Sequence, residues 1–284
     1  MPWTFAHPAA VLPIHALSGR RLPLPALIAG SLAPDAGYYI GQFALATHAH
    51  SLPGLLQLCV PVTLLSLLLL RQVAGDCLLL LPAPSRPVLE AALVLPGAAD
   101  VLLSPRVLFA CWLGAASHLL WDMATHQYGG LVLCWPWLAG DVTLWPGFAL
   151  PVFKLLQYGS SVFGIGVLWL AYRSKRCQYA AGVPDECGLA GWQSRRFFLL
   201  LLGGAGLLAM VLAYWSLHAV PADRVLRFWL VRSIVITTVL VLAGWIVCAQ
   251  AWRQPFFTGL PASAAERRRC PESTRPARVR PVHR

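Results

Sequence analysis

The sequence predicts an all-α polytopic membrane protein with about five transmembrane helices, short N-terminal helices and a disordered C-terminal tail. Of its 284 residues, 58% are hydrophobic and 12% are charged, whereas an ordinary soluble domain carries about 25% charged residues. Five apolar runs approach or exceed the ~17 to 25 residues that cross the hydrocarbon core of a bilayer as a helix. These predicted spans are residues 53–70, 107–124, 150–172, 197–217 and 228–250.

The segment before the first predicted span contains two shorter apolar stretches, residues 8–17 and 22–33. Neither is long enough to cross a bilayer alone. We expect short helices that pack on the bundle or lie at the membrane interface. The second should end just before Pro34, because a proline disfavours helical backbone at the preceding residue. Asp35 follows directly.

The distribution of basic residues predicts the orientation of the chain. Residues 126–149 contain no Lys or Arg but three tryptophans, a composition typical of an interface on the outer side. Eight arginines lie in the last 32 residues, and residues 71–106 carry three more. Because basic loops stay in the cytoplasm, we expect a bacterial inner-membrane protein with a cytoplasmic C-terminus and residues 1–52 outside. The three tryptophans are Trp135, Trp137 and Trp145.

Three regions follow from these features. Residues 1–172 hold the N-terminal helices, three spans and the candidate metal ligands. Residues 173–254 contain two further spans. Residues 255–284 are basic and rich in proline, with almost no large apolar side chains, so we expect a disordered tail.

The net charge of +11 comes from 22 basic and 11 acidic residues. Such an excess is compatible with nucleic-acid binding, but the basic residues flank the spans and fill the tail. We therefore expect membrane lipids with anionic head groups as the partners, and no nucleic acid. The eight cysteines contain no Cys-x-x-Cys pair. This spacing predicts neither a zinc ribbon nor a disulfide framework.

His118, Asp122 and His126 are spaced four residues apart near the end of a predicted span. Each step of four turns a helix by only about 40°, so the three side chains would share one stripe. Zinc takes four N, O or S ligands in a tetrahedron, at least three from the protein when one position stays open for water. The predicted topology brings further candidates to the same side of the membrane: His7, Asp35, His48 and His50.

Two interpretations of these polar groups remain open. A hydrogen bond between helices would explain His118 and Asp122 without a metal, and His126 would then lie at the interface. Lys154 and Gln157 are three residues apart near the start of a predicted span. Lys154 would either extend to the membrane interface or contact a phosphate or oxyanion beside the metal.

Five motifs carry a resemblance to a known family. They are MPWTFAHPAAVLP, ALIAGSLAPD, HSLPG, GAASHLLWDMATH and KLLQYGSS, in this order. On these motifs, most of residues 1–172 resembles a bacterial membrane family, the domain of unknown function 4184 family, whose function is unassigned. The chain is more distantly similar to membrane-bound metal-dependent hydrolases of the YdjM type. Through them it is similar to zinc-dependent phospholipase C, which is all-helical.

The phospholipase resemblance implies a ligand order. The residues that repeat its first part are Trp3, His7, Asp35, His50, His118, Asp122 and His126. By this resemblance Asp35, His50, His118 and Asp122 form one metal site. The His-x-x-x-Glu motif of the phospholipases does not follow His126, so the resemblance implies one or two metal ions rather than three.

Residues and resemblance together predict a hydrolase that depends on a divalent metal, zinc by its ligands, and acts on a phosphoester or ester of a lipid. His7 and His126 would be ligands of a second metal or proton-transfer groups, and Lys154 an anion contact. Two alternatives remain: a membrane protein that binds or transports metal without catalysis, and a structural protein whose His and Asp side chains join helices.

Overall fold

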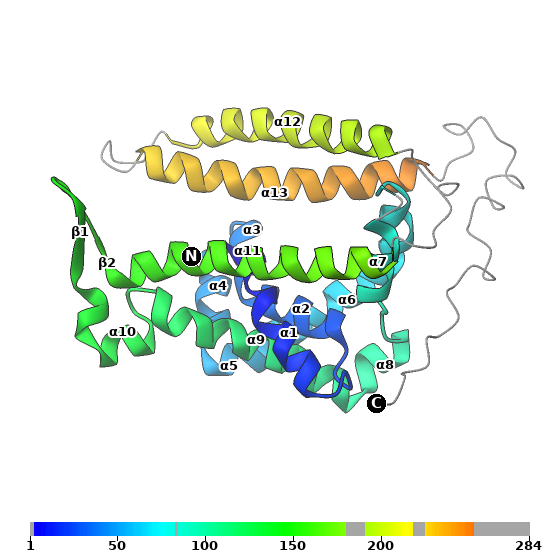
Figure 1. Cartoon of the computed structure of the whole chain (residues 1–284), viewed down its shortest axis with the longest axis horizontal. Helices are drawn as coiled ribbons and strands as arrows, with labels where there is room; N and C mark the ends of the chain where they lie inside the picture. The colour runs from blue at the N-terminus through cyan, green and yellow to red at the C-terminus, as the bar shows by residue number, and fades with distance from the viewer. Residues whose placement is uncertain (1–2, 83–84, 180–190, 218–224, 253–284) are drawn as a thin grey trace, which may run out of the picture. The chain divides into compact units, whose positions relative to one another are not determined.

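The computed structural model describes residues 3–82, 85–179, 191–217 and 225–252. The chain divides into two compact units, Met1–Gln72 with Val88–Ala181, and Val73–Pro87 with Gly182–Arg284. Figure 1 shows that helices dominate both units. The all-α prediction is confirmed, apart from one hairpin of two strands.

Five helical segments of the described residues are long and apolar enough to cross a membrane, as predicted. The first continues beyond the predicted end at residue 70, because Arg71 and Asp76 interrupt the apolar run without breaking the helix. The Arg71 guanidinium donates a hydrogen bond to the Pro96 carbonyl. The segments are Leu52–Leu79, Pro105–Cys134, Val152–Gln178, Gln193–Trp215 and Phe228–Trp252.

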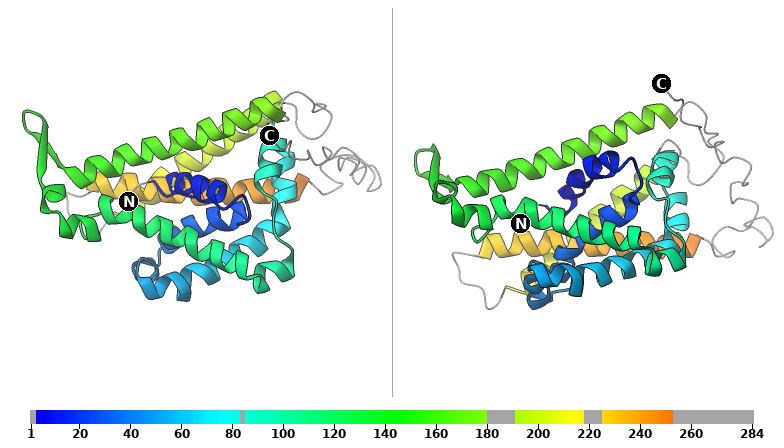
Figure 2. Two further views of the ribbon diagram at one scale, coloured as in Figure 1. Left: turned by 60° about the horizontal axis from the view of Figure 1, so that its bottom comes forward. Right: turned by 90° about the horizontal axis from the view of Figure 1, so that it is seen from below.

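The two short N-terminal helices are also confirmed. A 3-10 turn, η1 (Thr4–Ala6), precedes α1 (Pro8–Leu17). After α2 (Leu24–Leu32), the turn η2 (Ala33–Asp35) contains the predicted proline break. In both views of Figure 2, α1 lies between the green helices α9 (Pro105–Thr125) and α11 (Val152–Tyr179), and it packs against both.

Helices α2 and α9 approach each other closely through two glycines. A Cβ atom at Gly30 would lie 2.4 Å from the Cys111 carbonyl oxygen, and one at Gly114 would lie 2.3 Å from the Leu27 carbonyl oxygen. Leu27 and Cys111 are fully buried in the core between these helices. The absence of two side chains therefore sets the distance between α2 and α9.

A run of short helices links η2 to the first long helix. It consists of α3 (Ala36–Tyr39), α4 (Phe43–Ala49), α5 (Leu52–Gly54), the π-helical turn η3 (Leu55–Cys59) and α6 (Val60–Leu79). The Ser51 hydroxyl caps α5 by accepting a hydrogen bond from the Gly54 amide. The short helices leave His50 at the C-terminal end of α4.

The segments between spans contain several elements that were not predicted from the sequence. The first segment forms α7 (Arg86–Ala92) and α8 (Ala98–Leu103). The second forms α10 (Gly130–Cys134) and the turn η5 (Pro136–Ala139).

An antiparallel hairpin follows, made of β1 (Asp141–Trp145) and β2 (Phe148–Pro151). Figure 1 shows it projecting beyond the N-terminal end of α11. Its turn requires the positive φ of +82° at Gly147, and the rings of Trp145 and Phe148 stack with centroids 4.2 Å apart. This local stacking stabilises a hairpin whose strands are too short to give a recognisable alternating pattern.

The second unit contains α12 (Gly191–Trp215) and α13 (Val225–Trp252), which pack against each other. Ala205, Ala209 and Ala213 recur every four residues and are buried, as in close packing of membrane helices. Within this unit the Gln250 amide donates a hydrogen bond to the Asp76 carboxylate at 3.0 Å. The predicted disordered tail lies outside the described residues.

Candidate metal centre

Four of the predicted ligands converge at one point in the first unit. Asp35 ends η2, His50 follows α4, and His118 and Asp122 lie one turn apart on α9. The Nε2 atom of His50 lies 3.4 Å from Asp35 Oδ1 and 3.5 Å from Asp122 Oδ2. The Nε2 atom of His118 lies 3.7 Å and 3.3 Å from the same two oxygens. We call Asp35, His50, His118 and Asp122 the four-residue cluster.

Backbone carbonyls determine which nitrogen of each histidine faces the cluster. His118 Nδ1 lies 2.7 Å from the Ser31 carbonyl oxygen, and His50 Nδ1 lies 2.7 Å from the Ala46 carbonyl oxygen. A carbonyl only accepts hydrogen bonds, so each Nδ1 must carry the hydrogen and donate it. In the neutral ring the Nε2 lone pair then points at the carboxylates. This arrangement is typical of histidine ligands of metals.

The cluster is largely sealed from water. Asp35 is 1% exposed, and His118 is fully buried. The Thr4 hydroxyl donates to Asp35 Oδ2 at 2.5 Å, while Asp35 Oδ1 has no hydrogen-bond donor among the described residues. Carboxylates buried in this way need a nearby positive charge, supplied by a proton or by a cation.

The electrostatics of the metal-free cluster assign that positive charge to His50. Burial lowers the pKa of His50, but interactions with Asp122 and Asp35 outweigh it and raise the pKa to about 10. Burial raises the pKa of Asp35, yet His50 and His118 lower it below the ordinary value of an aspartate. The proton on His50 Nε2 would therefore supply the positive charge that a metal ion between His50 and the two carboxylates would otherwise provide.

His7 and His126 face the other oxygen of Asp122. His7 Nε2 lies 3.7 Å and His126 Nδ1 lies 3.4 Å from Asp122 Oδ1. The His7 ring stacks on His118 with centroids 3.7 Å apart. Burial and the neighbouring His118 lower the pKa of His7 to about 3, so this ring is neutral. Asp122 thus has one oxygen in the four-residue cluster and the other beside two more histidines.

His126 faces Asp122 from the residue that caps the C-terminal end of α9. Helix α9 ends at Thr125, and His126 has the extended backbone angles φ −122° and ψ 144°. The His126 amide nevertheless donates to the Asp122 carbonyl at 3.2 Å, so the side chain lies one helical turn beyond Asp122 and faces it, as the four-residue spacing predicts. The chain leaves the helix at this residue, and its side chain still reaches the carboxylate.

The remaining candidates have other partners. His48 is exposed, and its Nε2 lies 2.8 Å from Gln57 Oε1. The Lys154 ammonium donates to Gln157 Oε1 at 2.7 Å and lies 5.7 Å from the centroid of the Phe153 ring. Contact of Lys154 with an anion stays a prediction.

Several groups around the cluster were not identified from the sequence. The carbonyls of Ser31 and Ala46 orient the histidines, and backbone atoms leave no signature in a sequence. Trp121 packs edge-on against His7 with ring centroids 5.5 Å apart. Thr4 offered a weak signal, since its hydroxyl lies in an apolar N-terminal motif three residues before His7.

The donor set suits a divalent metal ion. Two groups place their ligand atoms within 4.8 Å of one another: His7 with Asp35 and His118, and His50 with His118 and Asp122. Imidazole nitrogens and carboxylate oxygens together are typical ligands of zinc. His118 Nε2 and both ring nitrogens of His7 have no hydrogen-bond partner within the described part of the chain. This leaves available the lone pair of His118 Nε2 and that of one His7 nitrogen, since the other nitrogen of a neutral ring carries the hydrogen.

Comparison with known proteins places the chain in a family. No curated protein and no solved structure matches it. The model of one family, the domain of unknown function DUF4184, matches residues 1–251, beyond the five motifs and through the last span. The match covers most of the chain, which therefore belongs to the DUF4184 family.

Proposed function

We propose that this protein binds a divalent metal ion, zinc by its ligands, at Asp35, His50, His118 and Asp122, and uses it to hydrolyse a phosphoester or ester of a membrane lipid. One observation carries the proposal. The backbone orients two Nε2 atoms toward the same two buried carboxylate oxygens, at 3.3 to 3.7 Å. These separations exceed those of good hydrogen bonds and leave a central position for a cation.

The surrounding residues support hydrolytic chemistry. A bound metal would lower the pKa of a water molecule toward ~7 and polarise the scissile bond. The His126 side chain is 30% exposed, so it can exchange a proton with solvent or with a leaving group. Buried His7 is better suited to hold a second ion on Asp122 Oδ1 or to orient that carboxylate. Lys154 would contact the anionic head group.

Elemental analysis of the full-length protein in detergent tests metal binding. We expect one or two equivalents of metal per chain in the wild type, and loss of metal in His118→Ala and Asp122→Ala. His48→Ala is the matched control, because this exposed histidine pairs with Gln57 and should leave the metal content unchanged. A wild-type protein without stoichiometric metal would overturn the proposal.

Hydrolysis of phosphodiester and carboxylester lipids then separates an enzyme from a metal carrier. We expect release of a head group or an acyl chain that requires metal and is lost in Asp122→Ala. Bound metal without hydrolysis of either class would favour a carrier. The structural alternative, in which protonated His50 joins Asp35 to Asp122, predicts no bound metal.

A further inference from the structure

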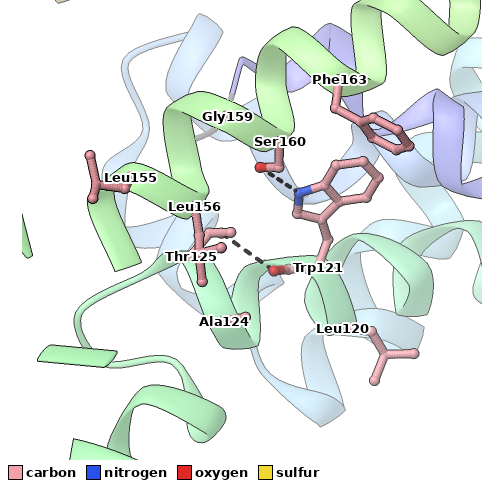
Figure 3. Close-up of a pocket in the computed structure, with 9 residues that line it drawn as sticks. All are labelled: Leu120, Trp121, Ala124, Thr125, Leu155, Leu156, Gly159, Ser160 and Phe163. Carbon is pink, nitrogen blue, oxygen red and sulfur yellow. Dashed lines mark hydrogen bonds between the residues drawn. The ribbon is translucent and has the colours of Figure 1, made fainter. Parts of the chain in front are cut away.

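A groove runs along the first unit between the membrane-spanning helices α9 and α11. Its volume is about 460 Å³, and it is lined by four residues of α9 and five of α11. Figure 3 shows the two helices as opposite walls, with Trp121 and Phe163 side by side at one end and Thr125 and Leu155 toward the other. The groove therefore lies at membrane depth if these helices span the bilayer.

The lining of the groove is almost entirely apolar. Leu120 and Phe163 are 66% and 67% exposed, and Leu156 is also exposed. On a helix that spans a membrane, exposed side chains of this kind face lipid. Gly159 widens the groove, because a Cβ atom there would have nothing within 4 Å. The space suits a flexible hydrocarbon chain.

The groove shares its inner wall with the candidate metal centre. The Trp121 indole donates to Ser160 Oγ at 3.0 Å (Figure 3), which ties α9 to α11. The Trp121 ring also packs against His7. Thr125 Oγ1 lies 3.5 Å from Asp122 Oδ1 and 3.3 Å from His126 Nδ1. Thr125 thus marks the polar end of an otherwise apolar groove.

We propose that this groove binds one acyl chain of a diacyl membrane lipid, which enters from the bilayer between α9 and α11. The polar part of the lipid then lies at Thr125, beside Asp122 and His126. The inference rests on the proposed function, since hydrolysis of the bound lipid requires the metal site. Binding of the lipid in the groove can be measured separately from its hydrolysis. The surrounding lipid tails are as apolar as the groove, so the hydrophobic effect does not favour the groove over the bilayer. Close packing and the polar end at Thr125 must therefore provide the preference of the acyl chain for the groove.

Two glycines of α11 provide a matched pair of variants. Gly159→Leu places a side chain in the groove at a position where its Cβ atom has nothing within 4 Å. Gly166→Leu makes the same change two turns further along α11. A Cβ atom at Gly166 also has nothing within 4 Å, but Gly166 does not line the groove. Both variants gain the same helix propensity. Gly159→Ala is a milder variant that fills less of the groove.

The experiment uses full-length protein in nanodiscs of phosphatidylethanolamine and phosphatidylglycerol. A phosphatidylglycerol with a photoactivatable diazirine in one acyl chain is the probe, and peptide mass spectrometry locates the labelled residues. The reference for ordinary lipid contact is α13, where Val247 is exposed. We expect groove peptides of the wild type to be labelled several-fold more than α13. Gly159→Leu should abolish this excess, Gly159→Ala should reduce it, and Gly166→Leu should leave it unchanged.

Other results would overturn the groove proposal. Examples are wild-type groove labelling no greater than that of α13, or an excess that Gly159→Leu does not change. A dimer that Gly159→Leu converts to a monomer would assign the groove to a second copy of the chain. Metal content measured on the same samples separates the two proposals. Metal without groove labelling would reject only the lipid site, and groove labelling without metal would reject only the metal-dependent function.

Discussion

His118 and His50 donate their Nδ1 hydrogens to the carbonyls of Ser31 and Ala46, and this determines the chemistry of the residues around them. With Nδ1 occupied, only Nε2 can bind a cation, and both Nε2 atoms face Asp35 and Asp122. The spacing of His118 and Asp122 predicted that these two side chains share a face. The tautomers could not be predicted, because they depend on single backbone carbonyls, one of them 87 residues away from His118 and the other four residues before His50.

Removal of the charge of Asp122 should abolish metal binding. Asp122→Asn keeps the shape of the side chain but removes its charge and replaces one oxygen with an NH2 group, which cannot bind a metal. Either the contact with His50 and His118 or the contact with His7 and His126 then loses its oxygen, and the other keeps only a neutral amide oxygen. Loss of a partner outside the ligand set typically costs 10- to 100-fold in metal affinity, so we expect a loss above about 100-fold. Titration calorimetry of the metal-stripped protein measures it. Asp100→Asn, on exposed α8, is the control, and equal affinities of the two variants would contradict the assignment.

Metal affinity should depend on pH through His50. Asp122 and Asp35 raise the pKa of His50 to about 10 against the effect of burial, so the metal-free ring is protonated near neutral pH. A metal must displace this proton, and the affinity should rise about tenfold per unit between about pH 6 and 9. Calorimetry in buffers of different ionisation enthalpy counts the released protons. An affinity independent of pH, with no proton released, would contradict this role of His50.

The elements bring the ligands together through close helix packing. Helix α9 carries His118 and Asp122, and α2 supplies the Ser31 carbonyl that orients His118. The apolar composition of the chain, together with Pro34, predicted both helices and the end of α2. It did not predict the hairpin or the helices between spans, whose short segments carry too little periodicity. The four-residue spacing also did not predict that α9 ends at Thr125, one residue before His126, because the point where a helix ends depends on the chain beyond it.

Separation of α2 from α9 should weaken both the fold and the site. In Gly114→Ala the new Cβ atom would lie 2.3 Å from the Leu27 carbonyl oxygen, which is backbone and cannot rotate away. We expect a loss of about 1–3 kcal/mol in stability from overpacking, together with weaker metal binding as the Ser31 carbonyl moves. Thermal unfolding in detergent and metal titration measure the two effects. Gly75→Ala, where a Cβ atom has nothing within 4 Å, is the control, and equal behaviour of both variants would show that the close approach is unimportant.

At the scale of the whole molecule, the distribution of charge predicts which side of the membrane each end of a span faces. Five apolar helices support a membrane protein. The positive-inside rule predicts that the hairpin lies outside and the C-terminus lies in the cytoplasm. The four-residue cluster lies at the end of α9 that leads to this hairpin. The candidate metal centre would then face the outer side.

Thiol labelling of intact cells tests this orientation. Asp141→Cys introduces a thiol in exposed β1, and Cys134→Ser removes a nearby exposed thiol. We expect a membrane-impermeant maleimide to label this double variant in intact cells, and the Cys134→Ser parent to remain at background. Labelling that requires permeabilised cells would reverse the topology.

The sequence alone determined the membrane class, the five spans and the polar stripe of α9, because length, apolarity and helical spacing are local properties of the chain. Only the tertiary structure decided that Asp35 and His50 meet His118 and Asp122, and that Asp122 is shared with His7 and His126. It also revealed the groove between α9 and α11. These features depend on how closely segments that are distant in the sequence approach each other. Glycine contacts and single backbone carbonyls determine that approach, and no local sequence pattern encodes it.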